Sequence, residues 1–214
     1  MALAAGLLGT TALAAQNVGL QAAPLAFMVA LGVSVAANVR VGNLLGAGRA
    51  DDARHAAAVA LAVGGCIAVV LAAALLLLRN SISKVFSTDS AVIELASAIL
   101  PHVALFICCY FPQAVGQGIV RGCGEQARGA SLVLLGSWLV GVPAAFFLAL
   151  GPWRLGLAGL WGGQSLGYFV IDAGFVVLLV RIDWTHIAQN ARQVGAAAED
   201  AAPVSRDSTA VVEA

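Results

Sequence analysis

Long stretches without a charged side chain are the feature that most limits how this chain can fold. No Asp, Glu, Lys or Arg occurs in residues 1–39, 55–78, 95–120, 129–153 or 155–171. A helix needs about 20 predominantly apolar residues to cross the hydrocarbon core of a bilayer. Only 10% of the 214 residues are charged, against roughly 25% in soluble domains. The sequence therefore predicts an all-α, polytopic membrane protein, and it excludes soluble enzymes and nucleic-acid-binding domains.

The first apolar stretch is too long for one straight crossing. At ~1.5 Å per residue, residues 1–39 would extend ~58 Å, about twice the thickness of the hydrocarbon core. Residues 16–19, Gln-Asn-Val-Gly, form a polar, turn-prone cluster within it, so we expect the chain to reverse there. We predict a bundle of six helical spans, at about residues 1–15, 18–39, 55–78, 91–120, 130–150 and 157–180.

The basic residues are divided unequally between the two faces of this arrangement. With six spans, one side receives Arg40, Arg49, Arg54, Arg121, Arg128, Arg181, Arg192 and Arg206, and the other side receives Arg79, Lys84 and Arg154. The positive-inside rule predicts that the first side, which includes the C-terminus, is cytoplasmic. Residues 195–214 are Ala-rich and polar and include Pro203, a composition that favours a disordered cytoplasmic tail.

Asp172 is the one acidic residue that falls deep within a predicted span. It lies nine residues before Arg181, or ~13 Å from that boundary along a helix. A carboxylate near the bilayer centre costs about 2.5–3.5 kcal/mol even on the mildest insertion scale. Two interpretations remain open. Asp172 binds a proton or cation in a water-filled cavity, or it joins two helices as a protonated or hydrogen-bonded side chain.

The fourth predicted span places polar side chains beside a proline. Tyr110 and Gln113 flank Pro112, which removes one backbone donor and bends the helix. Transporters bind substrate beside bent or broken helices, so we expect these two side chains to line a cavity. Hydrogen bonds between helices are the alternative interpretation.

No pattern in the chain predicts an enzyme or a cofactor site. The four cysteines do not have zinc-site spacing. The sequence Gly-Gln-Ser-Leu-Gly at 163–167 fits the nucleophile-elbow motif, but that motif requires a strand-to-helix turn and here lies within an apolar helix. We expect no metal and no catalytic residue.

Two similar segments end the second and fourth predicted spans. Arg40 is followed by Gly42, Asn43 and Gly46, and Arg121 is followed directly by Gly122. A basic residue next to glycine places its charge at the membrane interface and lets the chain reverse. The pairs Gly42/Gly46 and Gly118/Gly122, and the series Gly159/Gly163/Gly167, also have the spacing of closely packed helix faces.

Three segments carry a resemblance to a known family. Residues 27–48, FMVALGVSVAANVRVGNLLGAG, closely resemble the end of the eighth helix in multidrug and toxic compound extrusion (MATE) transporters. Residues 120–126, VRGCGEQ, are similar to the cytoplasmic end of the tenth helix in that family. Residues 156–163, GLAGLWGG, together with 181–184, RIDW, resemble the last span. The order and spacing of the three fit residues 1–194, in the style of eukaryotic members.

The resemblance implies a fold and an activity. MATE transporters usually have 12 spans in two six-helix lobes, and they export organic cations, drugs or organic acids in exchange for H⁺ or Na⁺. Residues 1–194 look like the C-terminal lobe, beginning partway through the seventh helix. The resemblance implies secondary active efflux by alternating access. The implied partners are the lipid bilayer, a small organic solute, and an N-terminal lobe or second chain.

Departures from the family pattern concern its acidic positions. Gln21 stands where animal-type members have an acidic residue in the eighth helix, and Tyr110 where the tenth helix has one. Gln113 matches a glutamine of plant-type members, and Asp172 matches no family site. The predicted cavity residues are therefore Asp172, Tyr110, Gln113 and Gln21. The alternative is a non-transporting fragment or scaffold that associates with full-length transporters.

Overall fold

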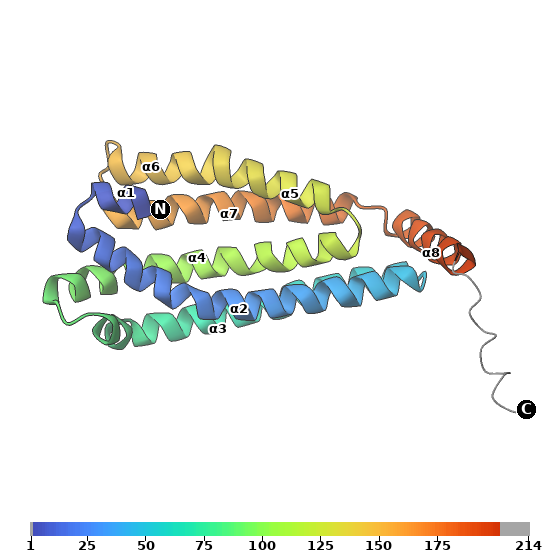
Figure 1. Ribbon diagram of the computed structural model, residues 1–214, viewed down its shortest axis with the longest axis horizontal. Helices are drawn as coiled ribbons and strands as arrows, with labels where there is room; N and C mark the ends of the chain where they lie inside the picture. The colour runs from blue at the N-terminus through green and yellow to red at the C-terminus, as the bar shows by residue number, and fades with distance from the viewer. Residues whose placement is uncertain (1, 202–214) are drawn as a thin grey trace, which may run out of the picture.

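The protein folds as a bundle of helices that run side by side along one direction (Figure 1). The structure, a computed structural model, describes residues 2–201. Its elements are α1 (Ala2–Leu7), α2 (Thr10–Gly46), α3 (Ala50–Phe86), α4 (Ser90–Gly122), α5 (Gln126–Leu135), the π-helix η1 (Gly136–Gly141), α6 (Val142–Leu150), α7 (Gly156–Arg181) and α8 (Trp184–Ala201). Five helical segments among these residues are long and apolar enough to cross a membrane: α2, α3, α4, α7 and the continuous segment 126–150. The predicted all-α membrane fold is confirmed.

The turn predicted at residues 16–19 is wrong. The chain reverses at Gly9, whose φ of +110° is a conformation that glycine adopts without steric cost. Helix α2 then continues through Gln16 and Gly19 to Gly46. Of the two polar side chains that suggested a turn, Asn17 is exposed, and Gln16 is buried and accepts a hydrogen bond from Trp161 on α7. The predicted spans 1–15 and 18–39 are thus replaced by a six-residue α1 and one long α2.

The C-terminal segment also differs from its prediction. Helix α8 continues to Ala201, so residues 195–201 are helical where a disordered tail was predicted. The remainder of that predicted tail, residues 202–214, lies outside the described residues. Indole and aliphatic side chains on α8 pack against α2, α3 and the end of α7, and these contacts support the helix.

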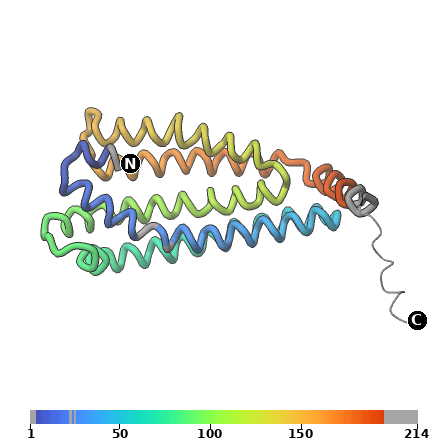
Figure 2. Tube along the Cα trace, viewed as in Figure 1, coloured from blue at the N-terminus to red at the C-terminus, as the bar shows by residue number. Residues whose placement is uncertain are grey.

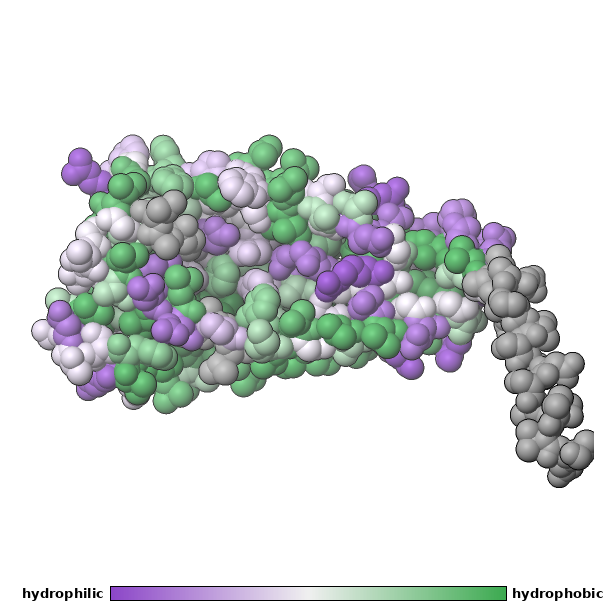
Figure 3. Space-filling model, in the orientation of Figure 1, coloured by the Kyte–Doolittle hydropathy of each residue, from purple (hydrophilic) through white to green (hydrophobic). Residues whose placement is uncertain are grey.

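Helix α4 lies between α7 and the hairpin of α2 and α3 (Figure 2). Its buried residues, which include Val103, Ile107 and Phe111, pack in a core cluster with side chains of α2, α3 and α7. Exposed side chains in the middle of the bundle are mostly apolar, and hydrophilic residues gather toward its two ends and along α8 (Figure 3). This distribution is expected of helices that contact lipid along their length and water at their ends.

Glycines bring α7 into close contact with α6 and η1. A Cβ at Gly163 would collide with the backbone of Ala145, and one at Gly159 would lie 2.6 Å from the backbone nitrogen of Ala149. Gly167 meets Gly141 in the same way. Close helix packing predicted for Gly159, Gly163 and Gly167 is confirmed. For Gly46 the prediction is wrong, because no atom lies within 4 Å of its Cβ position.

The π-helix η1 is followed directly by α6, and Pro143 lies in the first turn of α6. Proline removes an N–H donor and its ring clashes with the carbonyl four residues earlier. A wider π-turn before Pro143 relieves that conflict and keeps the span continuous. The segment 126–150 is therefore continuous, and it is long and apolar enough to cross a membrane as one unit despite its proline.

Candidate functional site

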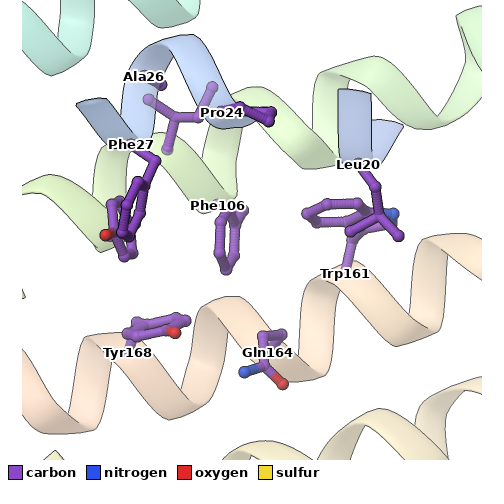
Figure 4. A pocket seen from close by; sticks show the side chains of 10 residues that line it. Leu20, Pro24, Ala26, Phe27, Phe106, Trp161, Gln164 and Tyr168 are labelled. Carbon is purple, nitrogen blue, oxygen red and sulfur yellow. The ribbon is translucent and has the colours of Figure 1, made fainter. Parts of the chain in front are cut away.

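A cavity of about 390 Å³ opens between α2, α4 and α7. Helix α2 contributes Leu20, Pro24, Ala26 and Phe27, α4 contributes Phe106, Ile107 and Tyr110, and α7 contributes Trp161, Gln164 and Tyr168. Figure 4 shows the rings of Phe27, Phe106, Trp161 and Tyr168 around this space, with the Gln164 amide on the α7 side. Three helices that are distant in sequence therefore build one aromatic site.

Phe106 is the centre of the aromatic cluster. Its ring stacks on Tyr110 with the centroids 5.8 Å apart and meets Trp161 and Tyr168 edge to face, each at 5.2 Å. Tyr110 in turn stacks on Phe27 at 5.9 Å. Such pairs contribute about 0.5–1.5 kcal/mol each beyond the area they bury. The cluster therefore holds ring faces in fixed orientations beside the cavity.

The polar groups of the cavity carry no charge. Tyr110 and Tyr168 supply hydroxyl groups, and Gln164 is a lining residue whose amide points away from the rings (Figure 4). The lining residues include neither an acidic nor a basic side chain. A ligand in this cavity would meet aromatic faces and a few neutral hydrogen-bonding groups. Ring faces are electron-rich and attract cations, so the surroundings suit a flat or cationic organic molecule better than an anion.

Residues of α2 hold the Trp161 side chain in place. Its indole Nε1–H donates a 2.9 Å hydrogen bond to Oε1 of Gln16, and both side chains are buried. The ring also lies over Gly19, where an added Cβ would stand 3.1 Å from the indole. Gln16 is therefore part of the support of the cavity wall, although its sequence position suggested a turn.

Asp172 lies on α7, four residues after Tyr168. Its side chain is partly buried, and its Oδ1 atom is buried without a hydrogen-bond partner among the described residues. Asp172 is not among the residues that line the aromatic cavity. It occupies the neighbouring turn of α7.

The other three predicted cavity residues occupy different places. Tyr110 lines the aromatic cavity. Gln113 is buried in α4 and does not line it. Gln21 faces a separate cavity of about 200 Å³, built by α2, α3 and α4. The structure therefore brings Tyr110 and Asp172 into adjacent regions of the α4–α7 interface and leaves Gln21 on the other face of α2.

The two similar segments at the α8 end of the bundle meet each other. A Cβ on Gly122 would stand 2.7 Å from the Asn38 carbonyl oxygen, and one on Gly42 would stand 3.6 Å from the carbonyl oxygen of Gly122. Arg121 donates through Nη2 to Ser34 Oγ at 3.1 Å, and Ser34 donates to the carbonyl of Ala114 at 2.6 Å. Arg40, Asn43 and Gly46 are exposed. The segments thus form a glycine-mediated crossing of α2 and α4.

The sequence pattern led us to predict only Tyr110 of the aromatic cluster. Phe106 and Tyr110 are four residues apart on α4, and Trp161, Gln164 and Tyr168 recur at intervals of three and four on α7. Side chains at this spacing share one helix face. That periodicity was the available signal for both sides of the cavity. Phe27 carried no comparable signal.

Comparison with known proteins places the chain in a family. A family model described as MatE matches residues 1–147, more than half of the chain. The chain belongs to the MatE family. Relatives of the MatE chain include multidrug and toxin extrusion protein 1 of Oryctolagus cuniculus, 36% identical over 87% of this chain and 33% of that protein. Multidrug and toxin extrusion protein 2 of Mus musculus is 34% identical over 88% of this chain and 33% of that protein.

An uncharacterized transporter of Schizosaccharomyces pombe is similarly related, with 35% identity over 89% of this chain and 35% of its own length. The MatE chain therefore spans about a third of the length of the curated relatives it matches. Efflux transport, rather than catalysis, is the activity that the names of the extrusion proteins indicate for the family.

Solved structures agree with the assignment. The crystal structure of the eukaryotic MATE transporter AtDTX14 matches 85% of this chain and 40% of its own, with a TM-score of 0.80 and 27% identity. The inward-facing conformation of a multidrug resistance MATE family transporter matches 88% of this chain and 42% of its own, with a TM-score of 0.76 and 19% identity. The second match supports the fold alone. The predicted resemblance to the MATE family is confirmed.

Proposed function

We propose that this chain is the C-terminal lobe of a secondary antiporter that exports small aromatic organic cations. The observation that carries the proposal is the aromatic cavity between α2, α4 and α7. A cation over the face of Tyr or Trp gains roughly 0.5–2 kcal/mol, more when water is excluded. Among the described residues no basic side chain lines the cavity, so an organic acid would find no counter-charge in this lining. A cation is therefore the substrate class favoured over an organic acid.

Asp172 is the group that we propose takes up the coupling ion, H⁺ or Na⁺. Its support is a buried carboxyl oxygen that has no hydrogen-bond partner among the described residues, on the helix that also carries Tyr168. An ionisable residue within a membrane span is a functional candidate because its burial is costly. Uptake of a proton or Na⁺ would neutralise that carboxylate. The neutral group would then cost less free energy to bury away from water than the charged group does. This change would couple ion binding to the α4–α7 interface.

We further propose that a second lobe completes the transporter, with alternating access between the two. The chain's coverage of about a third of its relatives supports this proposal. The α8 end of the bundle is proposed to be cytoplasmic. Among the described residues that end carries Arg40, Arg49, Arg54, Arg121, Arg128, Arg181 and Arg192, and the opposite end carries Arg79, Lys84 and Arg154. The positive-inside rule supports this orientation.

Ligand binding tests the cavity directly. The purified chain in detergent is titrated with ethidium, a planar aromatic cation, and with a neutral aromatic molecule of similar size. Tyr110→Leu is expected to weaken ethidium binding about 2- to 30-fold, which corresponds to about 0.5–2 kcal/mol. Phe169→Leu is the matched control, because Phe169 is an exposed α7 aromatic outside the cavity lining. Equal loss in both variants would remove the cavity from the proposal.

Transport tests the coupling. Proteoliposomes contain the chain alone or with a full-length family member, and ethidium movement is followed under an imposed pH or Na⁺ gradient. Asp172→Asn is expected to abolish gradient-driven movement and to leave ethidium binding intact. A variant that still responds to both gradients would remove Asp172 from the coupling step.

The alternative function is that of a non-transporting scaffold. Its support is also the short coverage of the full-length relatives. The same proteoliposomes separate the two functions. A chain that is inactive under all gradients and binds tightly to a full-length transporter supports the scaffold instead.

A further inference from the structure

An open groove lies between α5 and α7 near the end of the bundle where α8 begins. Its volume is about 580 Å³. The apolar part is lined by Leu132, Leu135, Ala173, Gly174, Val177 and Leu178. Leu135 and Val177 are about half exposed, so the groove opens outward from the bundle.

Two arginines and one hydroxyl group stand among the lining residues of this groove. Arg128 and Ser131 belong to the first turns of α5, and Arg181 is the last residue of α7. None of the lining residues is acidic. Arg128 makes a 3.3 Å ion pair with Glu125, yet its side chain is 65% exposed and Glu125 does not line the groove. The groove therefore joins an apolar channel to two positive charges at the expected membrane interface.

Small residues on α7 keep the apolar part open. Ala173 and Gly174 lie where a larger side chain would fill the space, and a Cβ on Gly174 would already stand 2.9 Å from Leu132. Arg181 follows Ala173 by eight residues, so the groove extends ~12 Å along α7 from the charged end. This length is suited to a hydrocarbon chain whose polar head stays beside the arginines.

We infer that the groove between α5 and α7 binds one anionic phospholipid, with its phosphate between Arg128 and Arg181 and an acyl chain along Leu132, Leu135 and Val177. Basic pockets between membrane helices on the cytoplasmic side bind anionic headgroups. Arginine suits the phosphate because its planar guanidinium presents several donors at once. A lipid fits better than free phosphate because most of the lining is apolar.

A second groove, between α2 and α3, also contains arginines, but its lining includes an acidic side chain, unlike that of the α5–α7 groove. That groove also contains two arginines, Arg40 and Arg49. However, Asp52 lies in its lining and makes a 2.7 Å ion pair with Arg49. An anionic headgroup there would compete with a carboxylate that is already present. The α5–α7 groove is therefore the better site for an anion.

Native mass spectrometry of the full chain in detergent tests the inference. The chain is titrated with dioleoyl phosphatidylglycerol, with dioleoyl phosphatidylcholine, and with soluble glycerol phosphate. One phosphatidylglycerol per chain is expected to bind in preference to phosphatidylcholine. Arg128→Gln and Arg181→Gln are each expected to weaken phosphatidylglycerol binding about fivefold, the change that corresponds to about 1 kcal/mol per arginine. Arg54→Gln is the control, an exposed arginine of the same end outside this groove.

A second variant tests the acyl-chain part of the groove without touching the charges. Ala173→Phe places a ring in the channel and is expected to weaken binding of the lipid while leaving helical circular dichroism unchanged. Three results would overturn the inference: equal binding of the two lipids, equal loss in Arg54→Gln, or competition by glycerol phosphate at the affinity of the lipid. The last result would identify a soluble phosphate site. Because no transport is measured, these outcomes do not depend on the proposed antiport.

Discussion

The indole N–H of Trp161 on α7 donates a 2.9 Å hydrogen bond to the side-chain oxygen of Gln16 on α2, and both residues are buried. Trp161 also meets Phe106 edge to face at 5.2 Å. The hydrogen bond thus connects the first long helix to the aromatic wall of the cavity. It sets the orientation of the indole ring that a bound molecule would meet.

Gln16→Leu should destabilise the bundle by about 1–3 kcal/mol. The substitution removes the acceptor and leaves the buried indole N–H without a partner, and an unpaired buried donor costs this amount. The free energy of unfolding, measured by titration with a denaturing detergent, checks the change. Trp161→Phe is the complementary variant, since it removes the donor from the same bond. In the double variant the loss should be smaller than the sum of the single losses, and strict additivity would contradict the coupling.

Gly163→Ala should loosen the contact between α6 and α7. A Cβ at this position collides with the backbone of Ala145, so one helix must move, and overpacking of this kind costs about 1–3 kcal/mol. Gly162→Ala is the matched control, because no atom lies within 4 Å of its Cβ position. The two variants are compared by thermal unfolding in detergent. Equal unfolding temperatures would show that this helix contact tolerates separation.

Gly118→Ala should disturb the crossing of α2 and α4. The new methyl group would stand 2.7 Å from Ser34 Oγ and even closer to the Ser34 backbone oxygen. The hydrogen bond from Arg121 to Ser34 would then be broken or displaced. We expect lower stability and faster proteolysis at the α4–α5 connection. Gly46→Ala, whose Cβ position is open, should leave both unchanged, and a similar loss there would point to a general effect of replacing glycine.

Cys123, in the turn after α4, should react slowly with maleimide at neutral pH. Burial and, to a lesser extent, the nearby negative charge of Glu125 together raise the pKa of its thiol to about 12. Because the thiolate is the reactive form, the rate should increase about tenfold per pH unit between pH 7 and 10. Peptide mapping after timed labelling measures the rate.

A thiol at an exposed neighbouring position supplies the comparison for Cys123. Gln126→Cys in a Cys123→Ala background places it at the start of α5, where the side chain is exposed. It should label much faster than Cys123 at pH 7. Equal rates at the two positions would show that Cys123 is accessible and that its thiol titrates in the ordinary range.

The crossing helices were largely predictable, because an uncharged stretch of sufficient length is a property of the sequence itself. The helices α4 and α7 begin and end within two residues of the predicted spans 91–120 and 157–180. The error at Gln16 has a different origin. Its polar side chain looked like a turn signal, but its partner, Trp161, is 145 residues away. Local patterns cannot reveal which distant helix satisfies a buried amide.

The candidate site was predictable in part. Tyr110 was recognised from its place beside Pro112, and it does line the cavity. Phe106 and Tyr168 carried only the periodicity of an apolar helix face, which core residues share. What distinguishes them is the way α4 and α7 pack: Gly116 lies against Phe175, and the rings of Phe106 and Tyr168 meet about three turns before Gly116 on α4 and about two turns before Phe175 on α7. That packing follows from tertiary structure rather than from either helix alone.

Helix α8 contacts both α7, the last span, and the hairpin formed by α2 and α3. Trp184 donates to the Leu179 carbonyl at the end of α7, and Arg192 covers Gly48 in the α2–α3 turn, where a Cβ would stand 2.6 Å from the arginine. Helix α8 therefore lies across one end of the bundle and contacts both its last span and its first helical hairpin. Because α8 contacts both the end of α7 and the α2–α3 turn, a spectroscopic label on α8 would report relative motion of these two parts of the bundle.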